Sequence, residues 1–317
     1  MFLVIFLLSF NSALAVDINV ALDDSIQEAI TASSDGDVLL LAAGTYNEDI
    51  DFVGKAITVR GDAEGTILEG TGNGPVVTFN TDEGRNSVIE NLTVTGGNAT
   101  RGGGILIENA APSVKGSLVQ INRAESSGSG IYILGGNTAG DFALIQNNLI
   151  ARNSAVDRNA GDPHGLQINT SSPEVINNTV VRNDSNGIFI SGGGSSDPII
   201  RNNIIAYNGT RRRSQRRGRG ICFVGGAPDD VAINNNLFFR NTIGDFFLNG
   251  QDFKRIGAAE SNLNLDGFKD NLRGNPRFRS LKRLNVRLRN KSRASANGDD
   301  STDIGLTGGS EPNSAFL

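Results

Sequence analysis

The chain has 317 residues, with 40 glycines, 8 prolines and no tryptophan, and its formal net charge is −5. The single cysteine, Cys222, excludes an internal disulfide, so packing and hydrogen bonds must hold the fold together. Residues 1–150 carry 6 Lys and Arg against 18 Asp and Glu, whereas residues 211–293 carry 19 against 7. Either a long molecule has unevenly solvated faces, or its basic end binds an anionic partner.

The chain opens with an apolar run, Phe2 to Phe10, followed by Ala13-Leu14-Ala15. This pattern is typical of a signal peptide, here residues 1–15, although the usual basic residues before the run are missing. The run is too short to span a bilayer, so we expect no transmembrane segment. The alternative is the end of a cap helix. The pattern predicts a protein that is secreted or held at the cell surface, or that stays in the periplasm.

Residues 16–87 predict a cap and the first coils of a repeat fold. Acidic residues and Ser25 begin a short helical pattern with Ile26, Ala29 and Ile30 on one face. A solenoid must cover its open end, and an amphipathic helix does so. A turn and an apolar strand follow, and then further short apolar stretches at residues 44–46, 57–59 and 67–68.

Residues 88–248 repeat one nine-residue pattern: aliphatic, any residue, Asn-Asn or similar, any residue, aliphatic, two of any kind, Asn. Clear copies start at Ile145, Val175, Ile200 and Ile233, and degenerate copies at Val88 and Val114. The first column of the superposed copies reads Asn91, Ser117, Asn148, Asn178, Asn203, Asn236. The second column reads Gly96, Asn122, Asn153, Asn183, Asn208, Asn241. Each copy is followed by Gly and then apolar-x-apolar, at Gly104, Gly130, Gly165, Gly187 and Gly220.

This repeat predicts a parallel β-helix. Its apolar residues alternate in short runs without a helical period, which indicates short strands separated by turns. A copy returns every 25 to 33 residues, a period typical of stacked supersecondary units. Asn suits the corners because it tolerates left-handed backbone angles. Stacked at about 4.8 Å, equivalent asparagines can also hydrogen-bond one another.

Two further stretches carry a family resemblance. The run from Ser25 to Asp62 resembles the amino-terminal cap of the right-handed parallel β-helix proteins related to pectate lyases and pectin esterases. The repeats are similar to those shared by pectate lyases and mannuronan epimerases. Residues 275–278 and 302–305 resemble the closing coil of bacterial surface β-helix proteins, so residues 249–317 are expected to form C-terminal coils and a cap. The resemblance implies an all-β fold, a single right-handed parallel β-helix, but no one function.

The connections between the second Asn column and the next Gly differ in length. Residues 154–164 and 209–219 form long connections, whereas residues 184–186 form a minimal one. Because coils stack in register, we expect all three at one corner, where two long loops enclose a trough over Asp184. Functional residues collect on such loops of a rigid scaffold.

Chemistry on an acidic polysaccharide needs a cation that neutralises the uronate carboxylate, together with a positioned base and acid. The loops offer these groups, so we predict a catalytic set of Asp162, His164, Arg213 and Asp184. The floor should be the outward residues of the Gly-apolar-x-apolar strands, Leu106, Tyr132, Gln167, Phe189 and Cys222. The predicted substrate-binding residues are Tyr132, Gln167, Phe189, Arg211, Arg212, Arg216 and Arg217. Ordinary strand alternation explains the outward aromatics equally well.

The stretch Asp162-Pro163-His164-Gly165 resembles the DPHE motif of mannuronan epimerases, which implies catalytic roles for Asp162 and His164. It departs from that motif at Gly165, which the repeat's own glycine explains. The family's tyrosine is Asn159 here, and its second aspartate is Ser191. These departures weigh against epimerase activity.

Two classes of function stay open. The first is an exported polysaccharide lyase or epimerase that acts on acidic glycans, and the second is a noncatalytic β-helix used for adhesion, glycan binding or cell-surface architecture. We predict an exported carbohydrate-directed β-helix, with lyase-like activity as the preferred mechanism and the noncatalytic protein as the alternative. The arginine run at residues 211–219 is either a solvated insertion or a surface for an anionic polymer. Nucleic acid is disfavoured because no aromatic residues interleave with the arginines. No cofactor is expected; calcium at Asp229, Asp230, Asp299, Asp300 or Asp303 matches no known loop spacing.

Overall fold

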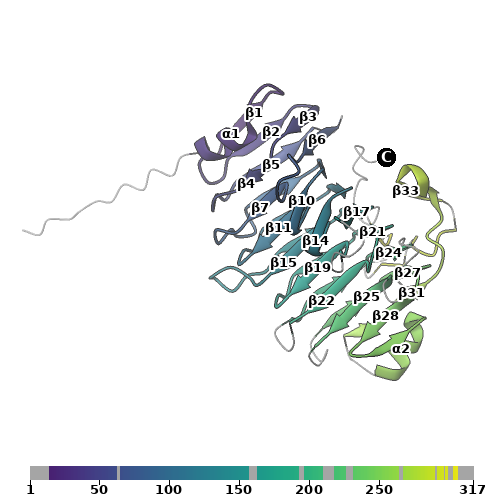
Figure 1. The fold of residues 1–317 in the computed structure, drawn as a ribbon. Coiled ribbons are helices and arrows are strands. Elements are labelled where there is room, and N and C mark those ends of the chain that lie inside the picture. Colours follow the sequence, from purple (N-terminus) through teal and green to yellow (C-terminus); the bar gives the residue numbers. More distant parts are fainter. Residues whose placement is uncertain are drawn as a thin grey trace, which may run out of the picture.

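In the computed structural model the chain forms one rod of stacked coils, which confirms the predicted parallel β-helix (Figure 1). The structure describes residues 14–62, 65–156, 163–192, 196–209, 218–225, 231–263, 267–289, 291–295, 297–298 and 303–305. Within these residues three long sheets, here called A, B and C, run the length of the rod. A complete coil contributes one short strand to each sheet in turn, so each coil has an A–B corner and a B–C corner.

Within each sheet, neighbouring strands come from successive coils and pair in parallel, except β28 and β29. Sheet A contains β1 (Asp17–Val20), β2 (Val38–Leu41), β5 (Thr58–Gly61), β8 (Val88–Glu90), β12 (Ser113–Lys115), β16 (Leu144–Gln146), β20 (Glu174–Ile176), β23 (Ile199–Arg201), β26 (Ala232–Asn234) and β30 (Phe268–Lys269). Sheet B contains β3 (Gly44–Asn47), β6 (Thr66–Glu69), β9 (Thr93–Thr95), β13 (Leu118–Gln120), β17 (Leu149–Ala151), β21 (Thr179–Val181), β24 (Ile204–Ala206), β27 (Leu237–Phe239) and β31 (Leu272–Arg273). Sheet C contains β4 (Ile50–Asp51), β7 (Val77–Phe79), β11 (Ile105–Glu108), β15 (Ile131–Leu134), β19 (Leu166–Asn169), β22 (Ile188–Ser191), β25 (Arg219–Val224), β28 (Gly244–Leu248) and β29 (Gln251–Phe253).

A small sheet at the B–C corner contains β10 (Asn98–Arg101), β14 (Arg123–Ser127) and β18 (Ser154–Ala155). A hairpin near the C-terminus contains β32 (Phe278–Ser280) and β33 (Asn285–Leu288), joined by the short 3-10 turn Leu281–Arg283.

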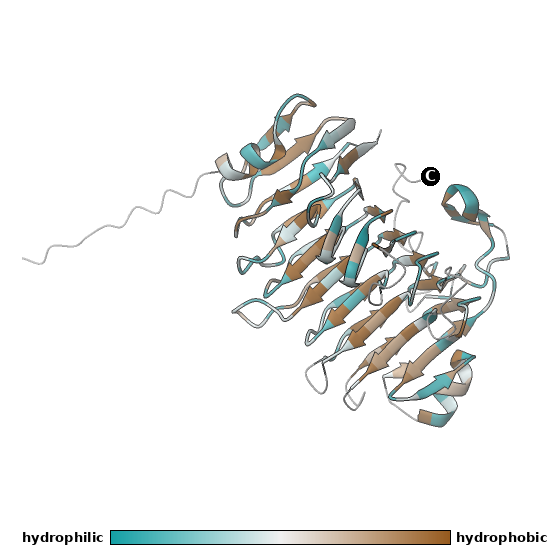
Figure 2. Cartoon of the chain, in the orientation of Figure 1, coloured by the Kyte–Doolittle hydropathy of each residue, from teal (hydrophilic) through white to brown (hydrophobic). Residues whose placement is uncertain are grey.

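The core runs along the axis of the rod because the apolar residues alternate along each strand. Val175 of sheet A, Val180 of sheet B, and Ile188 and Ile190 of sheet C are fully buried, and their equivalents above and below stack on them. Hydrophobic residues dominate the stacked strands, and many of the hydrophilic residues lie in the turns between them (Figure 2). Side-chain stacking of this kind buries apolar surface in every coil, at about 25 cal/mol per Å².

The N-terminal end is closed as predicted. Helix α1 (Ile26–Ala32) begins at Ser25, whose hydroxyl accepts a hydrogen bond from the Glu28 backbone N–H, and it buries Ile26 and Ile30. The Glu48 carboxylate accepts the free Ile26 N–H at 2.7 Å. This anion at the helix N-terminus satisfies donors that have no partner within the helix.

Two asparagine ladders fix the corners. At the A–B corner, Asn178 Nδ2 donates to Asn203 Oδ1 at 3.1 Å and to the Ile145 carbonyl at 2.8 Å. Asn178 Oδ1 in turn accepts from the backbone N and from Nδ2 of Asn148. The B–C corner repeats the arrangement through Asn122, Asn153, Asn183, Asn208 and Asn241. The predicted bonding between stacked asparagines is confirmed.

The register corrects the first degenerate copy of the repeat. Ile89, and not Val88, pairs with Val114, so the ladder positions of this coil are Leu92 and Gly97 in place of Asn91 and Gly96. A slip of one residue exchanges the inner and outer faces of a strand, and Leu92 rather than Asn91 is the buried residue.

The ladder at the A–B corner ends on a carboxylate. Asn236 Nδ2 donates to Asn271 Oδ1, and the backbone N and Nδ2 of Asn271 both donate to Glu260 Oε1, at 2.8 and 3.0 Å. Glu260 lies on helix α2 (Ile256–Leu263), which closes this end of the core. Asn271 belongs to a last coil that the repeat alignment missed.

The described residues from 275 to 305 (275–289, 291–295, 297–298 and 303–305), here called the C-terminal segment, lie along the outside of the rod beside sheet B (Figure 1). Leu284, Val286 and Ile304 are buried against outward residues of that sheet, among them Leu149, Ile204 and Leu237. The stretch that resembles a closing coil thus covers the outer face of sheet B. The segment and the outer face of sheet B therefore form a second apolar core outside the β-helix.

We expect Asn236→Ala to lower the free energy of unfolding by about 3 to 5 kcal/mol, because it leaves several buried donors and acceptors without partners. Asn235→Gly is the matched control: Asn235 has φ 54°, a left-handed angle that glycine adopts freely. Thermal and urea unfolding measure both variants. Equal stabilities would show that the ladder contributes no more than an ordinary corner residue.

Candidate functional site

The two long connections leave the rod from the same corner. Asn153, Asn183 and Asn208 stack at the B–C corner, and the described ends of the connections, Val156 with Pro163 and Gly209 with Gly218, follow the first and third of these. A Cβ on Gly209 would lie 2.5 Å from Gly218 Cα, so the ends of the second connection touch. Asp184, half-buried, lies on the coil between them, where its backbone N donates to the Asn153 carbonyl.

Several predicted residues cannot be placed. Asp162, Arg211, Arg212, Arg213, Arg216 and Arg217 lie outside the described residues. The proposed convergence of Asp162, His164 and Arg213 therefore stays a prediction.

The outward residues of sheet C stack in one row, as predicted, in the order Leu106, Tyr132, Gln167, Phe189, Cys222 and Phe247. Their exposure differs from the expectation of an open floor. Tyr132 is 2%, Gln167 7% and Cys222 4% exposed, so Tyr132 presents no ring face to a sugar.

Three planar groups from the B–C corner stack over the outer row. Arg101 lies over the Tyr132 ring at 5.6 Å, and Arg219 lies over the Phe247 ring at 4.3 Å. The His164 ring is stacked on Phe189 at 4.3 Å with an interplanar angle of 10°. In each pair the covering residue comes from the coil before the aromatic one. His164 thus shares a packing role with two arginines.

The imidazole of His164 is buried and held in one tautomer. Asn186 Oδ1 accepts the backbone N–H groups of Gly218 and Arg219, so its Nδ2 faces His164 Nδ1 at 3.4 Å. An amide nitrogen only donates, so Nδ1 accepts and a neutral ring carries its proton on Nε2. Gly165 belongs to the repeat, since a Cβ there would lie 2.6 Å from Asn183 Nδ2.

The two corners differ in the residues that take left-handed angles just before each ladder. At the A–B corner these residues are Asn147, Asn177, Asn202, Asn235 and Asp270, with Gly116 preceding them. At the B–C corner they are Ile121, Arg152, Arg182, Tyr207 and Arg240, with φ between 50° and 59°. Asn, Asp and Gly tolerate this conformation, whereas Arg and Tyr adopt it at a cost of about 1 to 2 kcal/mol each.

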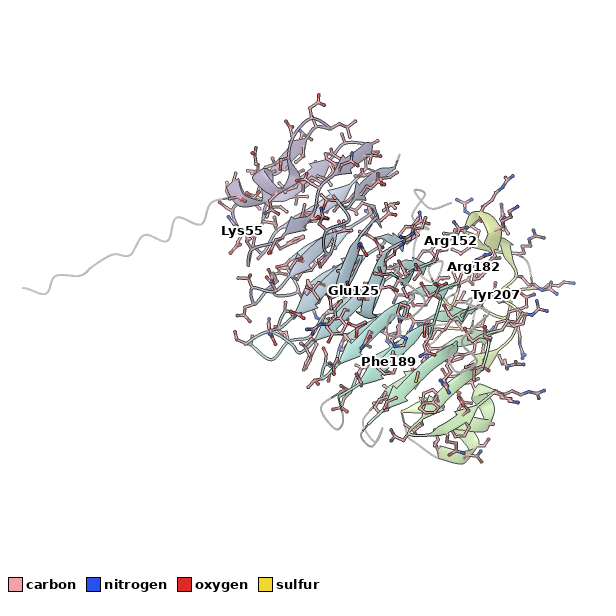
Figure 3. All side chains as sticks on the ribbon, in the orientation of Figure 1. Lys55, Glu125, Arg152, Arg182, Phe189 and Tyr207 are labelled. Atoms are coloured by element: carbon pink, nitrogen blue, oxygen red, sulfur yellow. The ribbon has the colours of Figure 1, made fainter. Side chains whose placement is uncertain are left out.

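We call Arg152, Arg182, Tyr207 and Arg240 the corner column. Figure 3 shows Arg152, Arg182 and Tyr207 in line along the rod. Arg152 Nη2 donates to the Lys282 carbonyl at 2.5 Å, and Tyr207 packs edge-on against Phe239 at 5.4 Å. The Arg240 guanidinium lies 5.3 Å over the same Phe239 ring. Burial raises the pKa of Tyr207, and Arg240 opposes that shift, so its hydroxyl is neutral near pH 7.

Sequence reasoning missed the corner column although the repeat contained it. The column is the eighth position of the nine-residue pattern, which reads Arg, Arg, Tyr and Arg in the four clear copies. The strained backbone there supports a functional reading, because such strain collects at binding and catalytic sites.

The C-terminal segment adds further positive charge beside the column. Residues 275–293 of this segment hold eight Arg and Lys and no Asp or Glu, and most of these cations are exposed. Lys282, which bonds Arg152 through its carbonyl, is one of them. Among the described residues no three His, Cys, Asp or Glu side chains gather as metal ligands would, and of the acids considered for calcium only Asp303 is described.

A family model for a right handed beta helix region matches residues 66–257, more than half of the chain, so the chain belongs to this family. A search of curated protein sequences gives no match. The chain is similar in structure to pectate lyase Pel9A, with 14% identity and a TM-score of 0.54 over 92% of this chain and 96% of that one. It is also similar to an alginate lyase from Paenibacillus sp. str. FPU-7, with 18% identity and a TM-score of 0.50 over 73% and 80%.

At these identities the similarity establishes the fold alone. That fold is the right-handed parallel β-helix that the sequence predicted. Helices of the described residues are all too short or too polar to cross a bilayer.

The strain at the corner column is testable. We expect Arg182→Asn to raise the free energy of unfolding by about 0.5 to 1 kcal/mol, because Asn tolerates the left-handed angle. Arg182→Ala removes the same charge but keeps a Cβ that does not favour this angle, so it should give no gain. Urea unfolding of the three proteins measures the difference. A loss of stability in Arg182→Asn would mean that Arg182 is held there by packing.

Proposed function

We propose that this protein is an exported β-helix that binds acidic polysaccharides at the corner column. The observation that carries the proposal is the placement of three arginines and a tyrosine in a strained conformation that the other corner gives to Asn and Asp. Arginine pairs with carboxylates through two parallel hydrogen bonds and stays charged at any physiological pH. A half-buried tyrosine between arginines offers a ring face for a sugar.

The class of ligand follows from charge and shape. The column holds three cations and one tyrosine, of which Arg152, Arg182 and Tyr207 lie in line along the rod, and the exposed Lys282 of the C-terminal segment contacts Arg152. A linear polyanion matches such a surface better than a compact anion does. The two solved structures with this fold are named for lyases of pectate and of alginate, which are acidic polysaccharides.

Lyase chemistry is a second candidate, at the trough predicted between the two long connections. Both solved neighbours are lyases, and the described ends of the two connections flank the coil that carries Asp184. In this reading Arg213 neutralises the uronate carboxylate, Asp162 and His164 supply base and acid, and Asp184 orients them. The buried, stacked ring of His164 favours the binding function over this one.

Polymer binding tests the first proposal. The triple variant Arg152→Asn, Arg182→Asn, Arg240→Asn should bind pectate or alginate at least about tenfold more weakly than the wild-type protein. Lys115→Gln, on the outer face of sheet A, is the charge control and should bind normally. Calorimetry at two salt concentrations measures the affinities, and the wild-type affinity should fall with salt. Equal binding by the triple variant and wild type would remove the column from the site.

Product formation tests the second candidate. A lyase raises the ultraviolet absorbance of a polyuronate as unsaturated ends appear. His164→Phe should abolish that signal without lowering thermal stability, because phenylalanine keeps a ring stacked on Phe189 but transfers no proton. Asp162→Asn should abolish it as well. Turnover that survives either change excludes that residue from catalysis, and no product on any polyuronate excludes the candidate.

A further inference from the structure

We infer that the open edge of strand β1 is a docking site, where an extended basic segment of another protein adds to sheet A as a further strand. This inference is independent of the corner column. In the part of the chain that the structure describes, β1 is the first strand of sheet A and pairs only with β2. Sheets B and C begin at the same end of the rod with β3 and β4, so the three edges can be compared.

The other two sheets are protected at this end. Gln27 of α1 takes the place of a neighbouring strand at β4, because its side-chain amide accepts from the Asp51 N–H at 2.7 Å and donates to the Asp51 carbonyl at 3.0 Å. Leu22 lies against Gly44 at the start of β3, where a Cβ would be 2.6 Å from Leu22 Cδ2. Proteins protect strand edges in such ways because an open edge recruits other strands. Among the described residues, β1 has no comparable protection.

The backbone of β1 offers hydrogen-bonding groups along its open side. The carbonyls of Val16 and Val20 accept backbone N–H groups from the chain of β2, so these residues face β2. Along a strand the backbone groups of successive residues point to opposite sides, so Asp17 and Asn19 direct their N–H and C=O groups away from β2. An extended peptide laid along β1 can bond to these groups as it would to any sheet edge.

A groove of about 380 Å³ follows this edge, between β1 and the start of α1 (Figure 1). The exposed carboxylates of Asp23, Asp24 and Glu28 line it. No Lys or Arg precedes Lys55 in the sequence, and Lys55 Nζ donates to the Ser33 carbonyl, just beyond the other end of α1. The groove beside the open edge is therefore negatively charged.

The chemistry of the partner follows from the groove. An added strand directs alternate side chains towards α1. A Lys or Arg there places its aliphatic stem on Ile18 and Ala29, and its charge reaches the carboxylates of α1. A second copy that paired through its own β1 would bring two sets of carboxylates together, and residues 1–13 carry no charge. A basic, extended segment of another protein is the occupant that matches both the edge and the charge.

A fluorescent peptide that alternates arginine with valine tests the site by anisotropy. It should bind the full-length protein, with an affinity that falls with salt. Asn19→Pro removes an N–H on the open side and should weaken binding about tenfold, whereas Asn19→Val keeps that N–H and should bind as the wild type does. Glu28→Gln should weaken binding about threefold. Glu69→Gln, an exposed acid on β6, is the charge control and should have no effect.

Hydrogen exchange followed by NMR tests the strand pairing without any variant. The N–H groups of Asp17 and Asn19 should exchange rapidly in the free protein and slowly once the peptide is bound. Slow exchange in the free protein would overturn the inference, because the chain itself or a second copy would already occupy the edge. Undiminished binding by a folded Asn19→Pro variant would show attraction by charge alone, and absence of peptide binding would also overturn the docking site. Thermal unfolding measures whether each variant is folded.

Discussion

The hydrogen bond between the side-chain amides of stacked asparagines is the interaction on which the rest of this structure depends. Each buried asparagine donates to the next coil and to a carbonyl of the previous coil, so a change of register in one coil breaks bonds in three. The chain of amides has one direction, and at the A–B corner Glu260 accepts its last donors. In a low-dielectric interior such aligned bonds reinforce one another.

A fixed ladder has a consequence for the residue just before it. Because the buried asparagine cannot move, the preceding residue must take a left-handed angle in every coil, whatever its side chain. The A–B corner meets this constraint with Asn and Asp, which tolerate the angle. At the B–C corner Arg and Tyr take it against their preference, and the ladders supply the free energy that holds them there. Under the proposed function, a position of this kind trades stability for polysaccharide binding.

The repeat made most of the fold predictable. The irregular coils at its two ends were not predictable in the same way. Four clear copies with alternating apolar residues leave one architecture, and the helix at Ile26 followed from its capping pattern. The register of the first copy was wrong because its one asparagine, Asn91, was aligned with the ladder, whereas Asn91 takes the left-handed angle just before the ladder position. Asn271 was missed because its coil ends after one ladder position and α2 separates it from the others.

For the candidate site, the corner from which the two long connections leave followed from the repeat alignment, but the burial of Tyr132 and Gln167 did not. Arg101 lies over the Tyr132 ring, and a sequence pattern does not contain the direction of such a side chain.

The basic residues of the C-terminal segment lie beside the column because this segment packs against the outer face of sheet B. The outer face of sheet B carries Leu149, Ile204 and Leu237, and left open it would be an apolar surface prone to association. Leu284 and Val286 cover it, whereas Lys282, Arg283 and Arg289 of the same segment are exposed to solvent. One segment therefore both buries the apolar face and adds positive charge beside Arg152, at one end of the column. A polyanion is attracted by that diffuse field from any direction, at a rate that depends on salt, whereas its final position depends on the few arginines that the ladder holds in place.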